Sequence, residues 1–242
     1  MVNENANAAS ANARTIAVIG AMDEEIALIE RSLEHVSRTR AAGLEVLEGT
    51  LATRGGETVR VAATVAGMGT VAAGAATQHL IDAHHPEAVL FTGIAGNLNP
   101  KLHIDDVVIG GTLRYLDTDM DLIDQAQPHL DEYHSDPALV KLAEATLADM
   151  GITYLVGTIA TGNYFVAGDE KVAAVKAATN ADCVEMEGAA VAHISAKNGV
   201  PCLVTRAMSD NADTDIEVFR TFDISRFADT AASMVVNLIA RM

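Results

Sequence analysis

Short apolar runs alternate with longer stretches of helical periodicity along almost the whole chain, and this alternation limits the possible folds more than any other feature. The apolar runs predict strands at Thr15–Gly20, Leu44–Ala52, Thr58–Gly67, Ala88–Gly93, Asp106–Leu113, Thr153–Thr161, Cys183–Met186 and Pro201–Met208. The helical patterns cover Asp23–His35, Thr70–His84, Pro137–Met150, Asp169–Ala178, Glu187–Asn198 and Ile224–Arg241. We therefore expect a three-layer α/β fold, with helices on both faces of a twisted, mostly parallel central sheet.

The organisation of the chain indicates one domain. No repeat, Pro-rich linker or low-complexity block interrupts it, and its 242 residues suit one hydrophobic core. We expect this domain over residues 14–242, after a disordered tail of residues 1–13. Gly55-Gly56 lies between two strand patterns and predicts a hairpin turn, so the sheet should be mixed. Residues 115–135 lack periodicity and should form an active-site or interface loop, or a disordered excursion.

Composition and charge argue against several classes of partner. The 16 Lys and Arg residues face 33 Asp and Glu residues, and this net charge of -17 would repel a phosphate backbone. No apolar run approaches the ~18 residues of a membrane-spanning helix, and no secretory signal is apparent at the N-terminus. Cys183 and Cys202 lie in apolar runs and are expected to be buried thiols. We expect a cytoplasmic protein that binds neither nucleic acid nor membrane.

Several common catalytic and cofactor motifs are missing. The eight histidines show no metal-ligand spacing, and we find no Gly-x-Ser-x-Gly, Walker loop or Cys-His pair. Gly67-x-Gly69-x-x-Ala72 matches a dinucleotide fingerprint, but the next expected strand ends at Thr92-Gly93 without the required carboxylate. We therefore expect neither a metal nor a cofactor, and interpret the glycines as a tight turn near a ligand.

Acidic residues gather where expected strands end, which is where open parallel sheets bind ligands. They are Glu25, Glu185, Glu187 and Asp210. Arg206 lies inside an apolar strand pattern, so it requires an anionic partner or a ligand. A structural ion pair with Glu185 or Glu187 and a functional role both remain open from spacing alone.

Six segments, taken in order, resemble the 5′-methylthioadenosine/S-adenosylhomocysteine nucleosidases of the nucleoside phosphorylase superfamily. They span nearly the whole chain beyond the tail and comprise Ile16–Glu25, Gly67–Gly69, Thr92–Leu98, Thr161–Phe165, Val184–Ala190 and Arg206–Asp210. The resemblance implies hydrolysis of the bond between adenine and the sugar of a 5′-modified nucleoside. It also implies a homodimer, in which the neighbouring subunit helps to build the pocket for the 5′ substituent.

The resemblance also implies a role for individual residues. Glu25 would be the base that activates water, and Asp210 the acid that protonates adenine N7. Glu187 with Met186 would hold the ribose hydroxyls, and Arg206 would order the water and Glu187. Phe165 would stack on the base, and Val166 would present its main chain to the adenine edge. Gly96 would lie against the bound nucleoside, and Met22 and Met68 would pad the sugar and its 5′ group.

The chemistry requires residues of these types. Adenine leaves poorly as an anion, so an acid must neutralise it as the glycosidic bond breaks. Asp210 would have to stay protonated near neutrality, although a free Asp titrates near ~3.9, so burial must raise its pKa. Glu25 must stay ionised, and the first turn of the expected helix at 23–35 favours an anion.

Some positions depart from the commoner family pattern. Ile94 stands where Ser is frequent, Ala66 where a hydroxyl is common, Asn163 replaces an Asp, and Tyr115–Asp119 lacks its usual His. These changes leave the acid and base intact and bear on the 5′ pocket.

Rival functions remain open. A phosphorylase would need an Arg in the strand-end glycine loops to hold phosphate, and those loops contain no cation, which favours hydrolysis. A futalosine-type hydrolase would differ only in the 5′ group of its substrate. The presence of Glu25 and Asp210 argues against a non-catalytic nucleoside-binding module, and the missing ribose carboxylate argues against a dinucleotide oxidoreductase.

Overall fold

The computed structural model describes residues 14–212 and 223–242, and the expected tail lies outside this range. Its central feature is a nine-stranded sheet in the order β2-β3-β4-β1-β5-β8-β7-β6-β9, in which β5 also pairs with β9. The strands are β1 (Thr15–Gly20), β2 (Glu34–Ala41), β3 (Leu44–Ala52), β4 (Thr58–Val65), β5 (Ala88–Asn97), β6 (Val107–Tyr115), β7 (Tyr154–Thr161), β8 (Cys183–Glu185) and β9 (Cys202–Asp210). The extra pairing closes β5, β8, β7, β6 and β9 into a ring.

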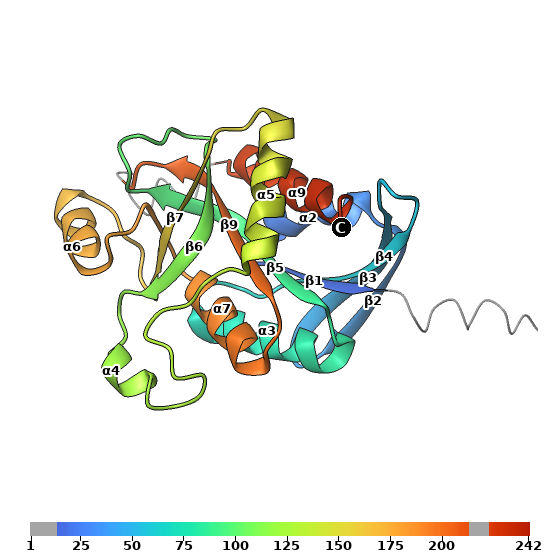
Figure 1. The fold of residues 1–242 in the computed structure, drawn as a ribbon, viewed down its shortest axis with the longest axis horizontal. Helices are drawn as coiled ribbons and strands as arrows, with labels where there is room; N and C mark the ends of the chain where they lie inside the picture. Colours follow the sequence, from blue (N-terminus) through green and yellow to red (C-terminus); the bar gives the residue numbers. More distant parts are fainter. Residues whose placement is uncertain (1–13, 213–222) are drawn as a thin grey trace, which may run out of the picture.

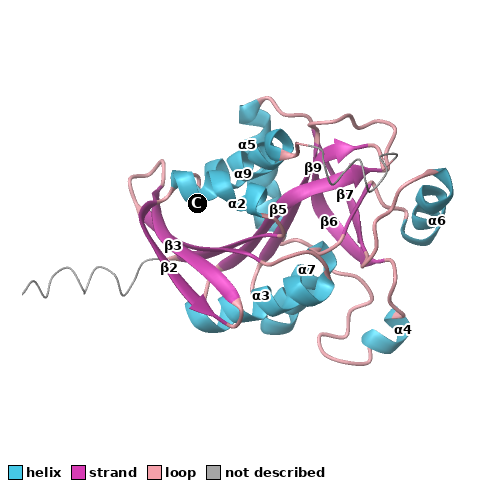
Figure 2. Ribbon diagram, turned by 180° about the vertical axis from the view of Figure 1, so that it is seen from behind, coloured by secondary structure: helices cyan, strands magenta, loops and turns pink. Residues whose placement is uncertain are grey.

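Helices cover both faces of the sheet, as expected (Figures 1 and 2). In the described part of the chain they are α2 (Asp23–Ser32), α3 (Thr70–His84), the short α4 (Met120–Ile123), α5 (Pro137–Met150), α6 (Asp169–Thr179), α7 (Gly188–Asn198) and α9 (Ser225–Ile239). Helices α2, α5 and α9 pack on one face, and α3 and α7 on the other. Five of the nine ladders are parallel, which confirms a mixed sheet.

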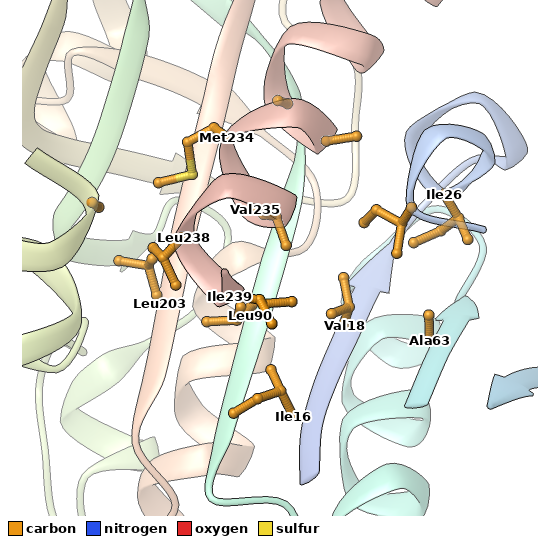
Figure 3. Close-up of a cluster of buried hydrophobic side chains, with 14 of the residues drawn as sticks. Ile16, Val18, Ile26, Ala63, Leu90, Leu203, Met234, Val235, Leu238 and Ile239 are labelled. Carbon is orange, nitrogen blue, oxygen red and sulfur yellow. The ribbon is translucent and has the colours of Figure 1, made fainter. Parts of the chain in front are cut away.

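Two apolar clusters fill the spaces between the layers. In the first, Val235 and Leu238 of α9 lie against Leu90 of β5 and Leu203 of β9 (Figure 3). The second lies between the opposite face of the sheet and α3 and α7. Burial of aliphatic side chains on both faces is the main stabilising contribution, at roughly 25 cal/mol per Å² of apolar surface removed from water. The carboxyl ends of the central strands are thereby held rigidly.

One expected helix is present but shorter than expected, and the strand after it was not expected. The helix expected over Asp23–His35 ends at Ser32, and Glu34–Ala41 forms β2 instead. Every residue of β2 is exposed, because this edge strand covers no core, so its sequence carries no alternation of apolar and polar positions. Antiparallel pairing with β3 and ion pairs from Arg38 and Arg40 to Glu45 hold it in place.

Other boundaries differ in ways that matter for the site. Strand β5 continues to Asn97, four residues past the expected end, and β9 continues to Asp210, so both carry further residues to the same edge of the sheet. The turn expected at Gly55-Gly56 is confirmed, because β3 and β4 pair antiparallel on either side of it. Residues 115–135 contain α4 and return to the sheet at Tyr133, which bridges Leu113.

Candidate active site

A pocket of about 510 Å³ lies at the carboxyl ends of the strands. Segments far apart in sequence form its walls: the turn from β1 to α2, the end of β5, the loop before α6, the turn from β8 to α7, and the end of β9. Nine of the ten site residues named from the sequence line it, namely Met22, Glu25, Met68, Gly96, Phe165, Val166, Met186, Glu187 and Asp210. The tenth, Arg206, lies behind the pocket wall and is 1% exposed.

Glu25 is buried in the first turn of α2. Its Oε2 accepts hydrogen bonds from the main-chain N–H groups of Ala21, at 2.6 Å, and Met22, at 3.1 Å, and its Oε1 accepts from the N–H of Ile94, at 3.0 Å. The lack of a side chain at Gly93 makes room for this carboxylate, since a Cβ there would overlap Oε1. Both oxygens are thus fixed by main-chain groups of two elements.

The environment of Glu25 acts on its pKa in two directions. Burial raises the pKa above its ordinary value of 4.5, while the charge of Arg206 and the three backbone N–H groups lower it, and burial prevails. The helix terminus therefore favours the ionised form of Glu25, as expected, but burial opposes it and has the larger effect on the pKa. A carboxylate with a raised pKa is a stronger base, which suits the activation of water.

Arg206 lies at the centre of a buried acidic cluster. Its Nη2 is 2.5 Å from Oε2 of Glu185 and 3.9 Å from Oε2 of Glu187, and its guanidinium stacks 4.0 Å above the centre of the Phe91 ring. Burial alone would lower the pKa of Arg206, but the neighbouring carboxylates outweigh it and raise the pKa. Of the two ion-pair partners that the sequence left open, Glu185 is the nearer.

The carboxylate of Glu185 holds the turn that leads into α7. Its Oε2 accepts from the N–H groups of Glu187, at 3.0 Å, and Gly188, at 2.7 Å, and its Oε1 accepts from the hydroxyl of Thr161. With Arg206, these contacts occupy both oxygens. From the sequence, Glu185 is one of several acidic residues at strand ends. In the structure it holds the start of α7.

Glu187 is 5% exposed and joins the pocket to α3. Its Oε1 accepts from the N–H of Gly69, 2.7 Å away, directly before that helix begins. Burial, together with the charge of Glu185, raises the pKa of Glu187 to about 8. A carboxyl group that is still protonated near neutral pH can both donate to and accept from a pair of hydroxyl groups.

Asp210 is the last residue of β9 and is 9% exposed. Its Oδ2 accepts from the hydroxyl of Ser209, at 2.8 Å, and its Oδ1 accepts from the N–H of Ala212, at 2.7 Å. Gly96 pairs with it across the β5–β9 ladder, so no side chain intervenes. Ser209 is not among the site residues expected from the sequence, although its position directly before Asp210 is a usable signal.

The loop before α6 supplies the aromatic wall. Phe165 is half-buried and Val166 is buried, while Met68, which also lines the pocket, is 66% exposed. Gly168 ends the loop and donates to the carbonyl of Ala212, at 3.0 Å, which links the wall to the segment that follows Asp210.

Known proteins are similar to this chain over nearly its whole length. A model of the phosphorylase superfamily matches residues 15–242. A 5′-methylthioadenosine/S-adenosylhomocysteine nucleosidase of Bacillus licheniformis is 35% identical over 233 residues, which cover 94% of this chain and 97% of the relative. One from Bacillus anthracis is 36% identical with the same coverage. The chain belongs to this nucleosidase family.

Solved structures agree with the assignment. The S-adenosylhomocysteine nucleosidase from Streptococcus pyogenes, in complex with 5-methylthiotubericidin, superimposes with a TM-score of 0.86 at 28% identity, covering 95% of this chain and 97% of that one. The Neisseria meningitidis enzyme, in complex with methylthio-immucillin-A, gives 0.86 at 31% identity, with 94% and 99% covered. A futalosine hydrolase of Helicobacter pylori gives 0.82 at 29%, with 93% and 97% covered.

As a member of this family the chain is an enzyme of the hydrolase class, and its departures from the family pattern can now be located. Ile94 uses its main-chain N–H to hold Glu25, a contact that does not depend on its side chain. Ala66 donates its N–H to the carbonyl of Gly20, at 2.8 Å.

Across residues 14–212 and 223–242, no group of three or more His, Cys, Asp or Glu side chains is placed to hold a metal ion. None of the described helices has the length and apolarity to span a bilayer.

Proposed function

We propose that the chain hydrolyses the N-glycosidic bond of 5′-methylthioadenosine, S-adenosylhomocysteine or both, releasing adenine and the 5′-thio-substituted ribose. The observation that carries the proposal is that Glu25, Glu187 and Asp210 line one pocket although they come from three different parts of the chain. Their surroundings differ, and such differences separate an acid from a base.

Each group has one step in the proposed reaction. Asp210 gives its proton to adenine N7 while the bond from N9 to C1′ breaks, so adenine leaves as a neutral molecule. Glu25 takes a proton from the water whose oxygen bonds to C1′, and Glu187 with Met186 holds the ribose hydroxyls. Arg206 does not line the pocket, so it acts by holding Glu185 and by its charge on Glu25 and Glu187.

The charge of the pocket favours water over phosphate as the second substrate. Among the described residues that line it, five are acidic and none is Lys, Arg or His. A phosphate ion would face this negative surface without a cation to hold it, whereas neutral water meets no such penalty. Hydrolysis is therefore favoured over phosphorolysis.

The apolar part of the pocket lining supports a thioether substituent over futalosine. Met22, Met68 and Ile224 line the pocket, and these flexible apolar side chains suit a sulfur-linked group. The similarity to a futalosine hydrolase keeps that substrate as the alternative to be tested.

We also propose that the enzyme is a cytoplasmic homodimer. Both cysteines are buried and free, which suits a reducing compartment. Large apolar side chains are exposed near the pocket and on the segment after β6, including Met68 at 66%, Val71 at 85% and Leu122 at 64%. Light scattering should give about twice the chain mass of 25.3 kDa. A monomer with full activity would contradict the dimer.

The reaction itself is tested by adenine release. The purified chain is incubated with methylthioadenosine, S-adenosylhomocysteine or futalosine, each with and without phosphate, and the products are separated. We expect both thio-nucleosides to release adenine, each at a rate that does not change when phosphate is added. Release that requires phosphate would indicate a phosphorylase, and release of base from futalosine alone would indicate the alternative hydrolase. Tight binding without release would indicate a binding module.

A further inference from the structure

Strands β6 and β7 remain joined for two residues beyond their ladder, which ends with Tyr115 opposite Thr161. Leu116 donates its N–H to the carbonyl of Thr161, at 2.9 Å, and packs so closely on Gly162 that a Cβ there would overlap the leucine side chain. The next pair is Asp117 and Asn163, and their contact is made by side chains.

Asn163 contacts two elements at once with its amide. Its Oδ1 accepts from the N–H of Thr70, at 3.0 Å, and from the hydroxyl of Thr70, at 2.9 Å. Its Nδ2 donates to Oδ2 of Asp117, at 3.2 Å, and its main-chain N–H donates to the same oxygen, at 2.7 Å. The partners determine which end of the amide is which, because a main-chain N–H can only donate and a carboxylate can only accept.

The position of Asn163 gives this contact a consequence for the pocket. Asn163 lines the pocket itself and stands two residues before Phe165. Thr70 begins α3, and the residue before it, Gly69, donates to Glu187. The two adjacent N–H groups at this helix start are thus taken by Glu187 and by Asn163, both of which line the pocket.

We infer that Asn163 is a positioning residue, whose amide holds the Phe165 loop, the start of α3 and the segment after β6 in one arrangement around the bound nucleoside. The inference rests on the proposed function. It requires a side chain that is both donor and acceptor at this place. Aspartate would keep the acceptor for Thr70 but lose the donor, and it would set two carboxylates against each other at Asp117.

The test is a cycle of variants in which the amide and the carboxylate are exchanged. Asn163→Asp should raise KM for methylthioadenosine about three- to tenfold while kcat changes less than about twofold, because repulsion between exposed carboxylates is modest and the acid and base are untouched. In the double variant Asn163→Asp/Asp117→Asn, the amide lies on the opposite partner, so KM should return to within about twofold of the parent. Asn198→Asp, on the exposed end of α7, adds the same charge elsewhere and should leave KM unchanged.

Hydrogen exchange gives a readout that does not depend on turnover. The main-chain amides of residues 116–118 and 162–165 should exchange faster in Asn163→Asp and return to the parental rate in the double variant. If the parent released no adenine, the proposed function would fail, while the exchange cycle would still report on the positioning contact. Parental KM and parental exchange in Asn163→Asp would overturn the inference, as would a double variant that shows no recovery.

Discussion

Nη2 of Arg206 lies 2.5 Å from Oε2 of Glu185, and both side chains are almost completely removed from solvent. The pair is the centre of the site, because Glu185 anchors the start of α7 and the same guanidinium lies 3.9 Å from Glu187. This buried cation compensates the charges of the carboxylates around it. If the guanidinium were removed, Glu185 would be left as an uncompensated buried charge.

The first prediction concerns this cation. Arg206→Met should lower the free energy of unfolding by about 3–5 kcal/mol, as measured by denaturant titration, because it leaves Glu185 buried without its partner. Adding Glu185→Gln should recover part of the loss. Arg40→Met is the control: its ion pair with Glu45 is exposed and should be worth less than about 1 kcal/mol. Equal effects of the two Arg variants would contradict the central role of Arg206.

The second prediction separates proton donation from binding. Asp210→Asn should lower kcat for methylthioadenosine about 10²- to 10⁴-fold with little change in KM, because the amide oxygen can still accept from Ala212. A 4-nitrophenyl riboside, whose leaving group needs no proton, should lose much less activity. Unchanged turnover of methylthioadenosine, or equal losses on both substrates, would exclude Asp210 as the acid.

The gathering of the named acidic residues around one pocket could be predicted because they sit at strand ends. Glu187 directly follows an expected strand and Asp210 comes two residues after one, and in a sheet with parallel central strands such positions converge on one edge. Nine of the ten named residues line the pocket; Glu25, Glu187 and Asp210 are indicated by strand ends, the other six by the family resemblance alone, and their individual roles stay predictions.

The features that could not be predicted from the sequence depend on contacts between residues far apart along the chain. Strand β2 could not be foreseen, because it buries nothing and so shows no alternation. The choice of Glu185 over Glu187 as the ion-pair partner of Arg206 depends on side-chain directions at a turn. The raised pKa of Glu187 likewise arises from burial beside Glu185, and neither distance nor burial is visible in a linear order of residues.

A third prediction follows from the raised pKa of Glu25. The base must be ionised, so on the acid side kcat should fall as the pH drops through this pKa, about tenfold per pH unit. Because burial raises the pKa above 4.5, the midpoint of the acid limb should lie above pH 4.5. Rates should be measured from about pH 4 to about pH 8, with circular dichroism at each pH to confirm folding. A flat profile down to pH 4.5 would rule out this assignment.

The fourth prediction uses Glu187 as a probe of stability. Its pKa is about 8 in the folded chain and near 4.5 when unfolded, so between these values the unfolded chain binds fewer protons and stability falls as the pH rises. Glu187→Gln removes this penalty, so relative to the parent it should gain stability between about pH 5 and about pH 9, by up to roughly 5 kcal/mol. Glu57→Gln, at an exposed position beside the hairpin turn, should differ from the parent by less than about 0.5 kcal/mol at both pH values. A constant difference for Glu187→Gln would show that the pKa is not raised.

The last prediction tests whether the pocket depends on a missing side chain. A Cβ on Gly93 would overlap Oε1 of Glu25, so Gly93→Ala must push the base away from its backbone donors. Because a displacement of the order of 1 Å can cost about 10²-fold in rate, kcat should fall by about that factor, and overpacking should cost about 1–3 kcal/mol of stability. Gly74→Ala, within α3, is the matched control: its nearest neighbour would be 3.6 Å away, and alanine favours a helix by about 0.5–1 kcal/mol. The control should keep full activity and gain stability. If Gly93→Ala also kept full activity, Glu25 would not need its observed position, and its role as the base would have to be reassigned.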